Sequence, residues 1–165
     1  WGVAAVGVRG APEEPGTRRA APVQVRMELS RILIRELTGF QVIELTGVLD
    51  GHDPDREPRF FPIVIGLPEA QAIDRRLKGV EIKRPQTHDL LASVIDQLGG
   101  RLESITITNL DDSTFYATLN VVSAAGDVVN IDSRPSDAIA LGIAGDVPIF
   151  VAEHVLESAS RDVDI

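Results

Sequence analysis

Two stretches of the sequence share one pattern: residues 63–73 read IVIGLPEAQAI, and residues 130–140 read NIDSRPSDAIA. Each begins with strand-like residues and continues, after a proline, with alanine and isoleucine at helical spacing. Proline is favoured in the first turn of a helix, where its missing N–H costs no hydrogen bond. Both stretches therefore predict a strand that leads directly into a helix, with Pro68 and Pro135 at equivalent positions.

The surrounding sequence extends this pattern into a repeat. Residues 32–79 and 105–145 each read as three strands followed by one helix, which a glycine closes. A further helix is expected between the repeats, over residues 87–98, with Thr87 as its N-cap. Runs of strands around isolated helices indicate an α+β fold. We therefore predict internally duplicated β-β-β-α units with a largely antiparallel sheet and an intervening helix.

The expected strands are short and separated by turn-forming residues. They cover residues 27–37, 41–47, 60–65, 102–108, 114–122, 127–132 and 147–152. Pro62 lies inside the third of them, and because proline cannot donate a ladder hydrogen bond, it predicts an edge strand or a bulge there.

The chain of 165 residues is long enough for one domain. Residues 1–26 are rich in Gly, Ala, Pro and Arg without apolar periodicity, which predicts a disordered or non-native extension. We expect the domain over residues 27–158 and a short tail over residues 159–165. Cysteine is absent and no apolar run approaches the roughly 20 residues of a membrane span, so a cytoplasmic protein without membrane association is expected.

The charge of the chain is strongly negative, with a formal net charge of −9. Beyond residue 26 the sequence holds 12 basic and 23 acidic side chains. Such a balance argues against broad binding of nucleic acid through phosphates, which needs a basic surface. A local basic patch or bound metal ions would reverse the sign of a single site.

Four blocks of the sequence resemble the bifunctional nuclease (BFN) domain family. They read, in this order, FPIVIGLPEAQAIDRRLKG, RPQTHDLL, STFYATL and DSRPSDAIALGIAGDVPIFVAEHVL, and the resemblance covers about residues 27–157. It implies an α+β fold with an internal duplication, in agreement with the repeat. It also implies nuclease activity toward both RNA and DNA, which some members of the family have.

The charged residues before the last predicted helix form the first candidate site. Asp132 and Asp137 could ligate Mg²⁺ or Mn²⁺, while Arg134 between them grips a phosphate. A structural interpretation stands beside this one, because Asp137 also complements the dipole at a helix start and Arg134 could pair with Asp132. The equivalent stretch has Ile65 and Leu67 where Asp132 and Arg134 stand, so capping alone does not explain this pair.

The start of the helix at residue 87 is the second candidate site. His88 is suited to act as a general base, and Asp89 follows it. Ordinary helix-start chemistry accounts for Thr87 and Asp89 but leaves His88 unexplained.

The helix that begins at Pro68 supplies the third candidate. Glu69 occupies a helix start like Asp137, so a symmetric cleft could gather both carboxylates around the metal ion. The basic residues that follow are the only plausible phosphate-contacting patch, although a solvated helix face explains them equally well. They are Arg75, Arg76, Lys78, Lys83 and Arg84.

These patterns favour a metal-assisted phosphodiesterase acting on RNA or DNA, without an organic cofactor and with self-association left open. The alternative is a non-catalytic regulatory module that recognises a protein or a small anionic ligand. An enzyme acting on a small phosphorylated metabolite is a third interpretation. Catalysis requires that the predicted site residues converge on one cleft.

Overall fold

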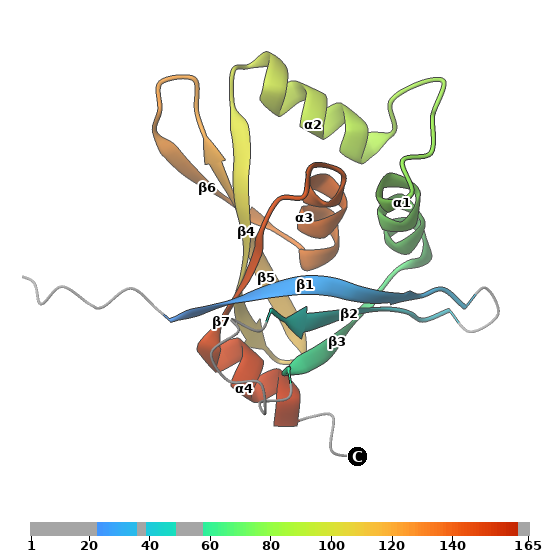
Figure 1. The fold of residues 1–165 in the computed structure, drawn as a ribbon, viewed down its shortest axis with the longest axis vertical. Helices are drawn as coiled ribbons and strands as arrows, with labels where there is room; N and C mark the ends of the chain where they lie inside the picture. The colour runs from blue at the N-terminus through green and yellow to red at the C-terminus, as the bar shows by residue number, and fades with distance from the viewer. Residues whose placement is uncertain (1–22, 36–38, 49–57, 162–165) are drawn as a thin grey trace, which may run out of the picture.

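The computed structural model describes residues 23–35, 39–48 and 58–161, which form seven strands and four α-helices (Figure 1). The strands are β1 (Gln24–Leu33), β2 (Gln41–Gly47), β3 (Phe60–Ile65), β4 (Arg101–Asp111), β5 (Thr114–Val122), β6 (Val128–Ser133) and β7 (Ile149–Ala152). The helices are α1 (Leu67–Leu77), α2 (Thr87–Gln97), α3 (Pro135–Gly142) and α4 (Glu153–Arg161), with a 3₁₀ turn η1 (Ile143–Gly145) after α3.

All seven strands belong to one sheet with the order β3-β2-β1-β7-β4-β5-β6. Neighbouring strands are antiparallel except β4 and β7, which are parallel. The α+β fold and the largely antiparallel sheet are therefore confirmed. The three-strand sets β1–β3 and β4–β6 lie on either side of β7, and each leads into a helix, α1 or α3. Their origin by duplication stays a prediction.

The boundaries of several elements differ from the predicted ones. β1 begins at Gln24, and residues 24–27 pair with β7, so a boundary after residue 26 would cut through a strand. At the other end, α4 continues to Arg161 with Ala159 buried, so the last helical turn includes residues assigned to the tail. The prediction that Thr87 is the N-cap of α2 is wrong. Gln86 is the N-cap, and Thr87 is the first helical residue.

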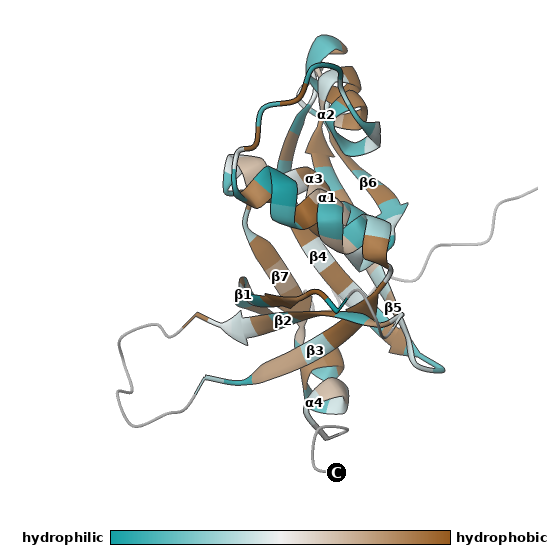
Figure 2. Ribbon diagram, turned by 90° about the vertical axis from the view of Figure 1, so that its right-hand side faces the viewer, coloured by the Kyte–Doolittle hydropathy of each residue, from teal (hydrophilic) through white to brown (hydrophobic). Residues whose placement is uncertain are grey.

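The core is formed by the strands and by α1, α3 and α4. Pro62 lies in an edge strand, as expected, and β3 alternates regularly between exposed and buried side chains. The ring of Phe61 stacks on Phe115 of β5 with a centroid separation of 5.6 Å. Figure 2 shows the apolar strands β4 and β7 behind the largely polar outer surface of α1. No helix among the described residues is long and apolar enough to cross a membrane.

The packing of α1 and α3 brings the two proline-led helices together. Gly66 precedes α1 and Arg134 precedes α3, both with extended backbone, so each chain segment turns sharply from a strand into its helix. The two helices contact each other, and α2 contacts α3 (Figure 1). Three helices are therefore side by side, and their first turns supply the site described below.

The helix α2 differs from the others because it has no buried residue. Most of its large apolar side chains are exposed, while Ile95 is partly buried against the core. The exposed ones are Leu90, Leu91 and Val94, and the C-cap residue Leu98 is exposed as well. Self-association of the chain stays a prediction, and these exposed apolar side chains of α2 are a surface that a second copy could cover.

Candidate active site

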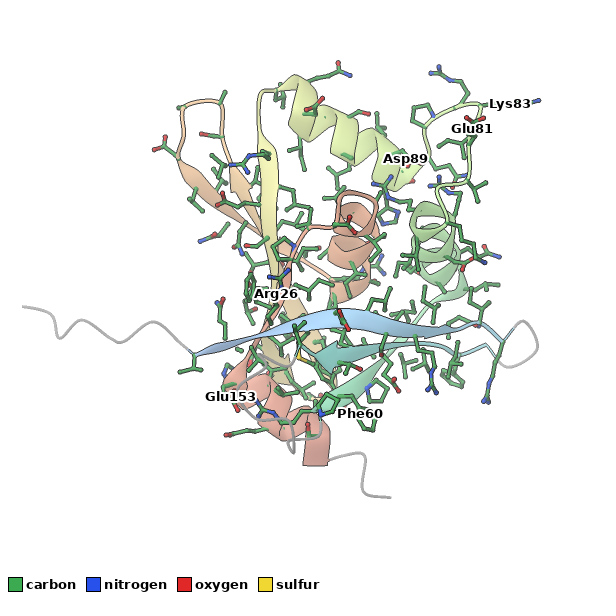
Figure 3. All side chains as sticks on the ribbon, in the orientation of Figure 1. Arg26, Phe60, Glu81, Lys83, Asp89 and Glu153 are labelled. Carbon is green, nitrogen blue, oxygen red and sulfur yellow. The ribbon has the colours of Figure 1, made fainter. Side chains whose placement is uncertain are left out.

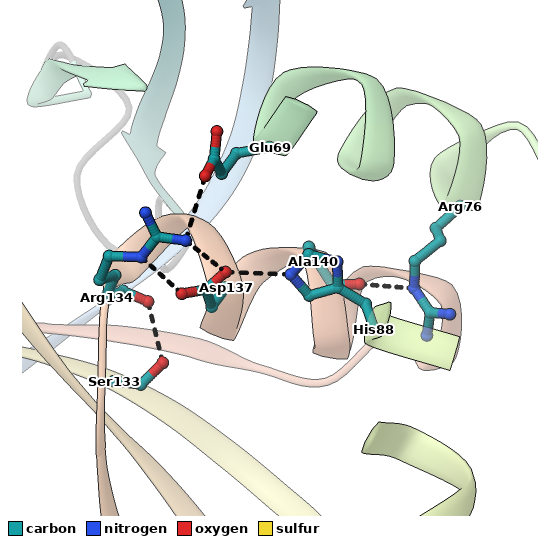
Figure 4. Close-up of polar contacts among 7 residues, drawn as sticks. All are labelled: Glu69, Arg76, His88, Ser133, Arg134, Asp137 and Ala140. Atoms are coloured by element: carbon teal, nitrogen blue, oxygen red, sulfur yellow. Dashed lines mark hydrogen bonds and ion pairs between the residues drawn. The ribbon is translucent and has the colours of Figure 1, made fainter. Parts of the chain in front are cut away.

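Four polar side chains from three helix starts form a connected set, which we call the helix-start cluster. They are Glu69 of α1, His88 of α2, and Arg134 and Asp137 at the start of α3 (Figure 4). The sequence placed all four among the candidate site residues, and the structure brings them together. They lie within hydrogen-bonding distance of one another in a chain that runs from Glu69 through Arg134 and Asp137 to His88.

Arg134 is the link between α1 and α3. Its Nε donates to Asp137 Oδ2 at 2.6 Å, and its Nη2 donates to Asp137 Oδ1 at 3.0 Å and to Glu69 Oε1 at 3.1 Å. The hydrogen bonds to Asp137 raise the pKa of Arg134 above its ordinary value. The side chain of Arg134 is 63% exposed although two carboxylates hold its guanidinium, so it remains accessible to an anion.

Asp137 joins this guanidinium to His88, whose Nε2 lies 3.0 Å from Asp137 Oδ1. Burial raises the pKa of Asp137, but the hydrogen bonds from Arg134 and His88 outweigh that effect, and the pKa is lower than usual. The carboxyl group is therefore ionised at neutral pH and only accepts hydrogen bonds, so the proton in the contact belongs to His88 Nε2. In the neutral imidazole, Nδ1 is then the nitrogen that can accept a proton.

Asp89 follows His88 in the chain but lies outside the helix-start cluster. Its carboxylate accepts a hydrogen bond from Arg75 at 2.7 Å and another from Arg76, and it also accepts the backbone N–H of Gln86. Figure 3 shows Asp89 at the end of α2 that lies nearest to α1. Asp89 therefore serves to attach α2 to α1.

Arg76 extends the same attachment to α3. Its Nε donates to the carbonyl of Ala140 at 2.6 Å, and its Nη2 donates to that of Leu141 at 3.2 Å (Figure 4). Its side chain is 9% exposed, so it is poorly placed to meet a polymeric substrate. Arg75, Arg76 and Asp89 thus form a clamp that holds the start of α2, and with it His88, against α3.

The other predicted residues do not join the helix-start cluster. Asp132 is exposed on β6, and no hydrogen bond or ion pair within the described residues engages its side chain. Lys78 pairs with Asp74 on its own helix at 2.8 Å. Lys83 and Arg84 are exposed in the connection from α1 to α2, and Figure 3 shows Lys83 extending outward. The predicted basic patch is therefore divided, and substrate binding by its members stays a prediction.

Residues 52–164, more than two thirds of the chain, match the family model of the bifunctional nuclease domain. The chain belongs to this family. An uncharacterized protein from Mycobacterium tuberculosis is 42% identical over 101 residues, which are 61% of this chain and 59% of that protein. "Bifunctional nuclease 1" of Arabidopsis thaliana is 24% identical over 123 residues, covering 66% of this chain and 38% of the relative. "Bifunctional nuclease 2" of the same plant is 26% identical over 100 residues, covering 59% and 30%.

The chain thus spans about three fifths or less of the length of these relatives. The part that matches the bifunctional nuclease domain contains every member of the helix-start cluster. It also contains the clamp of Arg75, Arg76 and Asp89, whereas β1 and β2 precede it.

The residues of this bifunctional nuclease domain do not form a ready site for a divalent metal ion. In the part of the chain that the structure describes, no group of three or more His, Asp or Glu side chains is arranged to hold one. The guanidinium of Arg134 lies between the carboxylates of Glu69 and Asp137, where it offsets part of their negative charge. Asp132, the third predicted ligand, is not joined to them. A requirement for Mg²⁺ or Mn²⁺ stays a prediction, and no chemical step below depends on it.

Removal of the Asp89 charge is expected to destabilise the domain. Asp89→Asn should lower the free energy of unfolding at pH 7 by about 3 kcal/mol, because two poorly exposed guanidinium groups lose their partner. Burial raises the pKa of Asp89, but its hydrogen bonds with Arg75 and the Gln86 N–H and the charge of Arg76 bring it below the usual value. Its contribution is therefore complete above the unfolded pKa of about 3.9 and is lost as the pH falls through the lower folded value.

Urea denaturation of both proteins between pH 7 and pH 3 measures this difference, which should shrink below about pH 4. The exposed Asp96, on the same helix, supplies the matched control, and Asp96→Asn should change the free energy of unfolding by less than about 0.5 kcal/mol. Equal stabilities of the Asp89 and Asp96 variants at pH 7 would show that the clamp does not hold α2.

Proposed function

We propose that this bifunctional nuclease domain hydrolyses phosphodiester bonds of RNA and DNA at the helix-start cluster. The observation that carries the proposal is the continuous contact of a histidine of α2 with a carboxylate and an exposed guanidinium at the start of α3. Membership of the family and the names of the plant relatives support nucleic acid as the substrate class.

Each residue of the cluster has a role that follows from its contacts. Asp137 holds Nε2 of His88 as the donor, so Nδ1 accepts a proton from an attacking water molecule. The water oxygen forms a bond to phosphorus while the bond from phosphorus to the leaving oxygen breaks. The imidazolium then returns its proton to the departing oxygen, which restores neutral His88. Because the nucleophile is water and not a ribose hydroxyl, the same scheme serves RNA and DNA.

Arg134 is the group in the cluster that can bind the phosphate. Its Nε and Nη2 are engaged by Asp137 and Glu69, while its Nη1 makes no hydrogen bond within the described residues. A guanidinium whose orientation is fixed in advance stabilises the negative charge that develops on the non-bridging oxygens. Glu69 fixes it from the α1 side and so acts as a positioning residue.

A second candidate function is a regulatory module that binds another protein. The exposed apolar side chains of α2 favour this alternative, and in that case the ion pairs of the cluster serve only to connect α1, α2 and α3. The two candidates predict different consequences for a variant that keeps the fold and loses Arg134.

Cleavage of 5′-labelled single-stranded RNA and DNA tests the proposal. We expect the purified protein to cleave both, and Arg134→Ala to lower kcat/KM by about 10²-fold, since one transition-state donor group is lost. Arg101→Ala is the matched control, because Arg101 is 70% exposed and pairs only with Glu103 on the surface. Parallel reactions with Mg²⁺, with Mn²⁺ and with a chelator measure the metal requirement. Equal loss in both variants, or cleavage by neither, would contradict the assigned role of Arg134.

A further inference from the structure

A pocket of about 300 Å³ lies beside the helix-start cluster, with Arg134 in its wall. It is bounded by the end of β3, the turn from β4 to β5, and the first residues of α3. Its apolar lining comes from residues 63–65 and from Phe115 and Pro135. Phe115 is held by its stack on the fully buried Phe61, so this wall is rigid. The volume is at the small end of the range for ligand pockets, which combine apolar walls with few polar groups.

Besides Arg134, the polar side chains of this pocket are three hydroxyls. Ser113 comes from the turn between β4 and β5, Thr114 from the start of β5, and Ser136 from α3. Ser136 is only 6% exposed as a residue, and no hydrogen bond within the described residues engages its hydroxyl. Because that hydroxyl lines the pocket, it is available to hydrogen-bond a ligand there.

The ligand that fits must therefore have apolar faces, a polar edge and a neighbouring negative charge. A nucleobase attached to its phosphate has all three, because its flat faces suit apolar walls and its edge carries donors and acceptors. The phosphate would meet Arg134, which belongs to both the pocket and the cluster.

We infer that this pocket binds one nucleobase of the substrate strand and so fixes the adjacent phosphate at Arg134. The inference rests on the proposed function and adds a subsite to it. Ser136 is the residue that hydrogen-bonds the base edge, and Phe115 and Pro135 contact its faces. The subsite explains how a strongly acidic protein holds a polyanion, since binding comes from the base as well as from charge.

Fluorescence anisotropy with two labelled single strands tests the subsite, one a normal DNA oligonucleotide and the other its abasic counterpart with the same phosphates. Binding is measured with the His88→Asn variant so that the labelled strand is not cleaved during the titration. We expect the normal strand to bind about 5- to 100-fold more tightly than the abasic strand. Ser136→Ala should weaken binding of the normal strand by about 2- to 10-fold and leave binding of the abasic strand unchanged.

Ser160→Ala is the matched control, because it removes a serine hydroxyl that makes no hydrogen bond within the described residues and does not line the pocket. Equal affinity for the two strands, or equal effects of the Ser136 and Ser160 variants, would overturn the subsite. Cleavage by the wild-type protein is followed in parallel. If the wild-type protein cleaves but both strands bind equally, only the subsite is overturned. If the normal strand binds more tightly but is not cleaved, the subsite is retained and the proposed nuclease activity is overturned.

Discussion

Replacement of His88 by asparagine is expected to reduce the rate of phosphodiester cleavage by about 10²- to 10⁴-fold, the usual contribution of a general base. The asparagine amide is able to donate to Asp137 as the imidazole does, but it cannot accept a proton at neutral pH. The fold should therefore survive, since the clamp through Asp89 holds α2 independently of His88. Initial rates of RNA and DNA cleavage, with thermal denaturation of the same samples, measure both expectations.

His154→Asn is the matched control for this experiment. His154 is exposed on α4. Figure 1 shows α4 below strands β1, β2 and β3, whereas α1, α2 and α3, which carry the helix-start cluster, lie above them. The control should cleave within about twofold of the wild-type rate, since a surface substitution distant from the site has little effect. Cleavage by the His88 variant at the wild-type rate would remove the general base from the proposed mechanism, and equal losses in both histidine variants would point to a contaminating nuclease.

The strand-to-helix junctions could be predicted because proline, glycine and apolar spacing act locally. Pro68 and Pro135 mark the two helix starts correctly. The similarity of the junctions suggested that one cleft could gather Glu69 and Asp137, and both carboxylates contact Arg134. The contact between Glu69 and Arg134 could not be predicted from the sequence. It depends on how α1 packs against α3, and the two residues are 65 positions apart.

The grouping of His88 with Asp89 shows why neighbouring residues make an unreliable site. Successive side chains on a helix point about 100° apart, so two adjacent residues face different partners. His88 meets Asp137, while Asp89 meets Arg75 and Arg76. The sequence identified all of these residues as candidates, but only the packing of three helices separates the cluster from the clamp.

No hydrogen bond or ion pair within the described residues joins Asp132 to Arg134, for a related reason. Asp132 still belongs to β6 and pairs with β5, whereas Arg134 is the N-cap of α3 and its side chain returns to Asp137 in the first helical turn. Two residues that are close in sequence therefore belong to different elements. The helical spacing of the apolar residues of α2 does not by itself reveal that Leu90, Leu91 and Val94 are exposed.

The most direct test of the helix-start cluster as a catalytic centre compares two carboxylates of the same segment. Asp137 contacts both His88 and Arg134, and Asp132 contacts neither. Asp137→Asn should lower cleavage of single-stranded RNA and DNA by at least about 10²-fold, because the carboxylate that orients a catalytic histidine is lost. Asp132→Asn should stay within about threefold of the wild-type rate, as expected for an exposed substitution outside the site.

The decisive measurement is the ratio of the initial cleavage rates of these two variants, purified by the same procedure and shown by thermal denaturation to be folded. We expect the Asp132 variant to cleave at least about 30-fold faster than the Asp137 variant. Equal rates for the two folded variants, or a larger loss for Asp132→Asn, would contradict the assignment of the catalytic centre to Glu69, His88, Arg134 and Asp137.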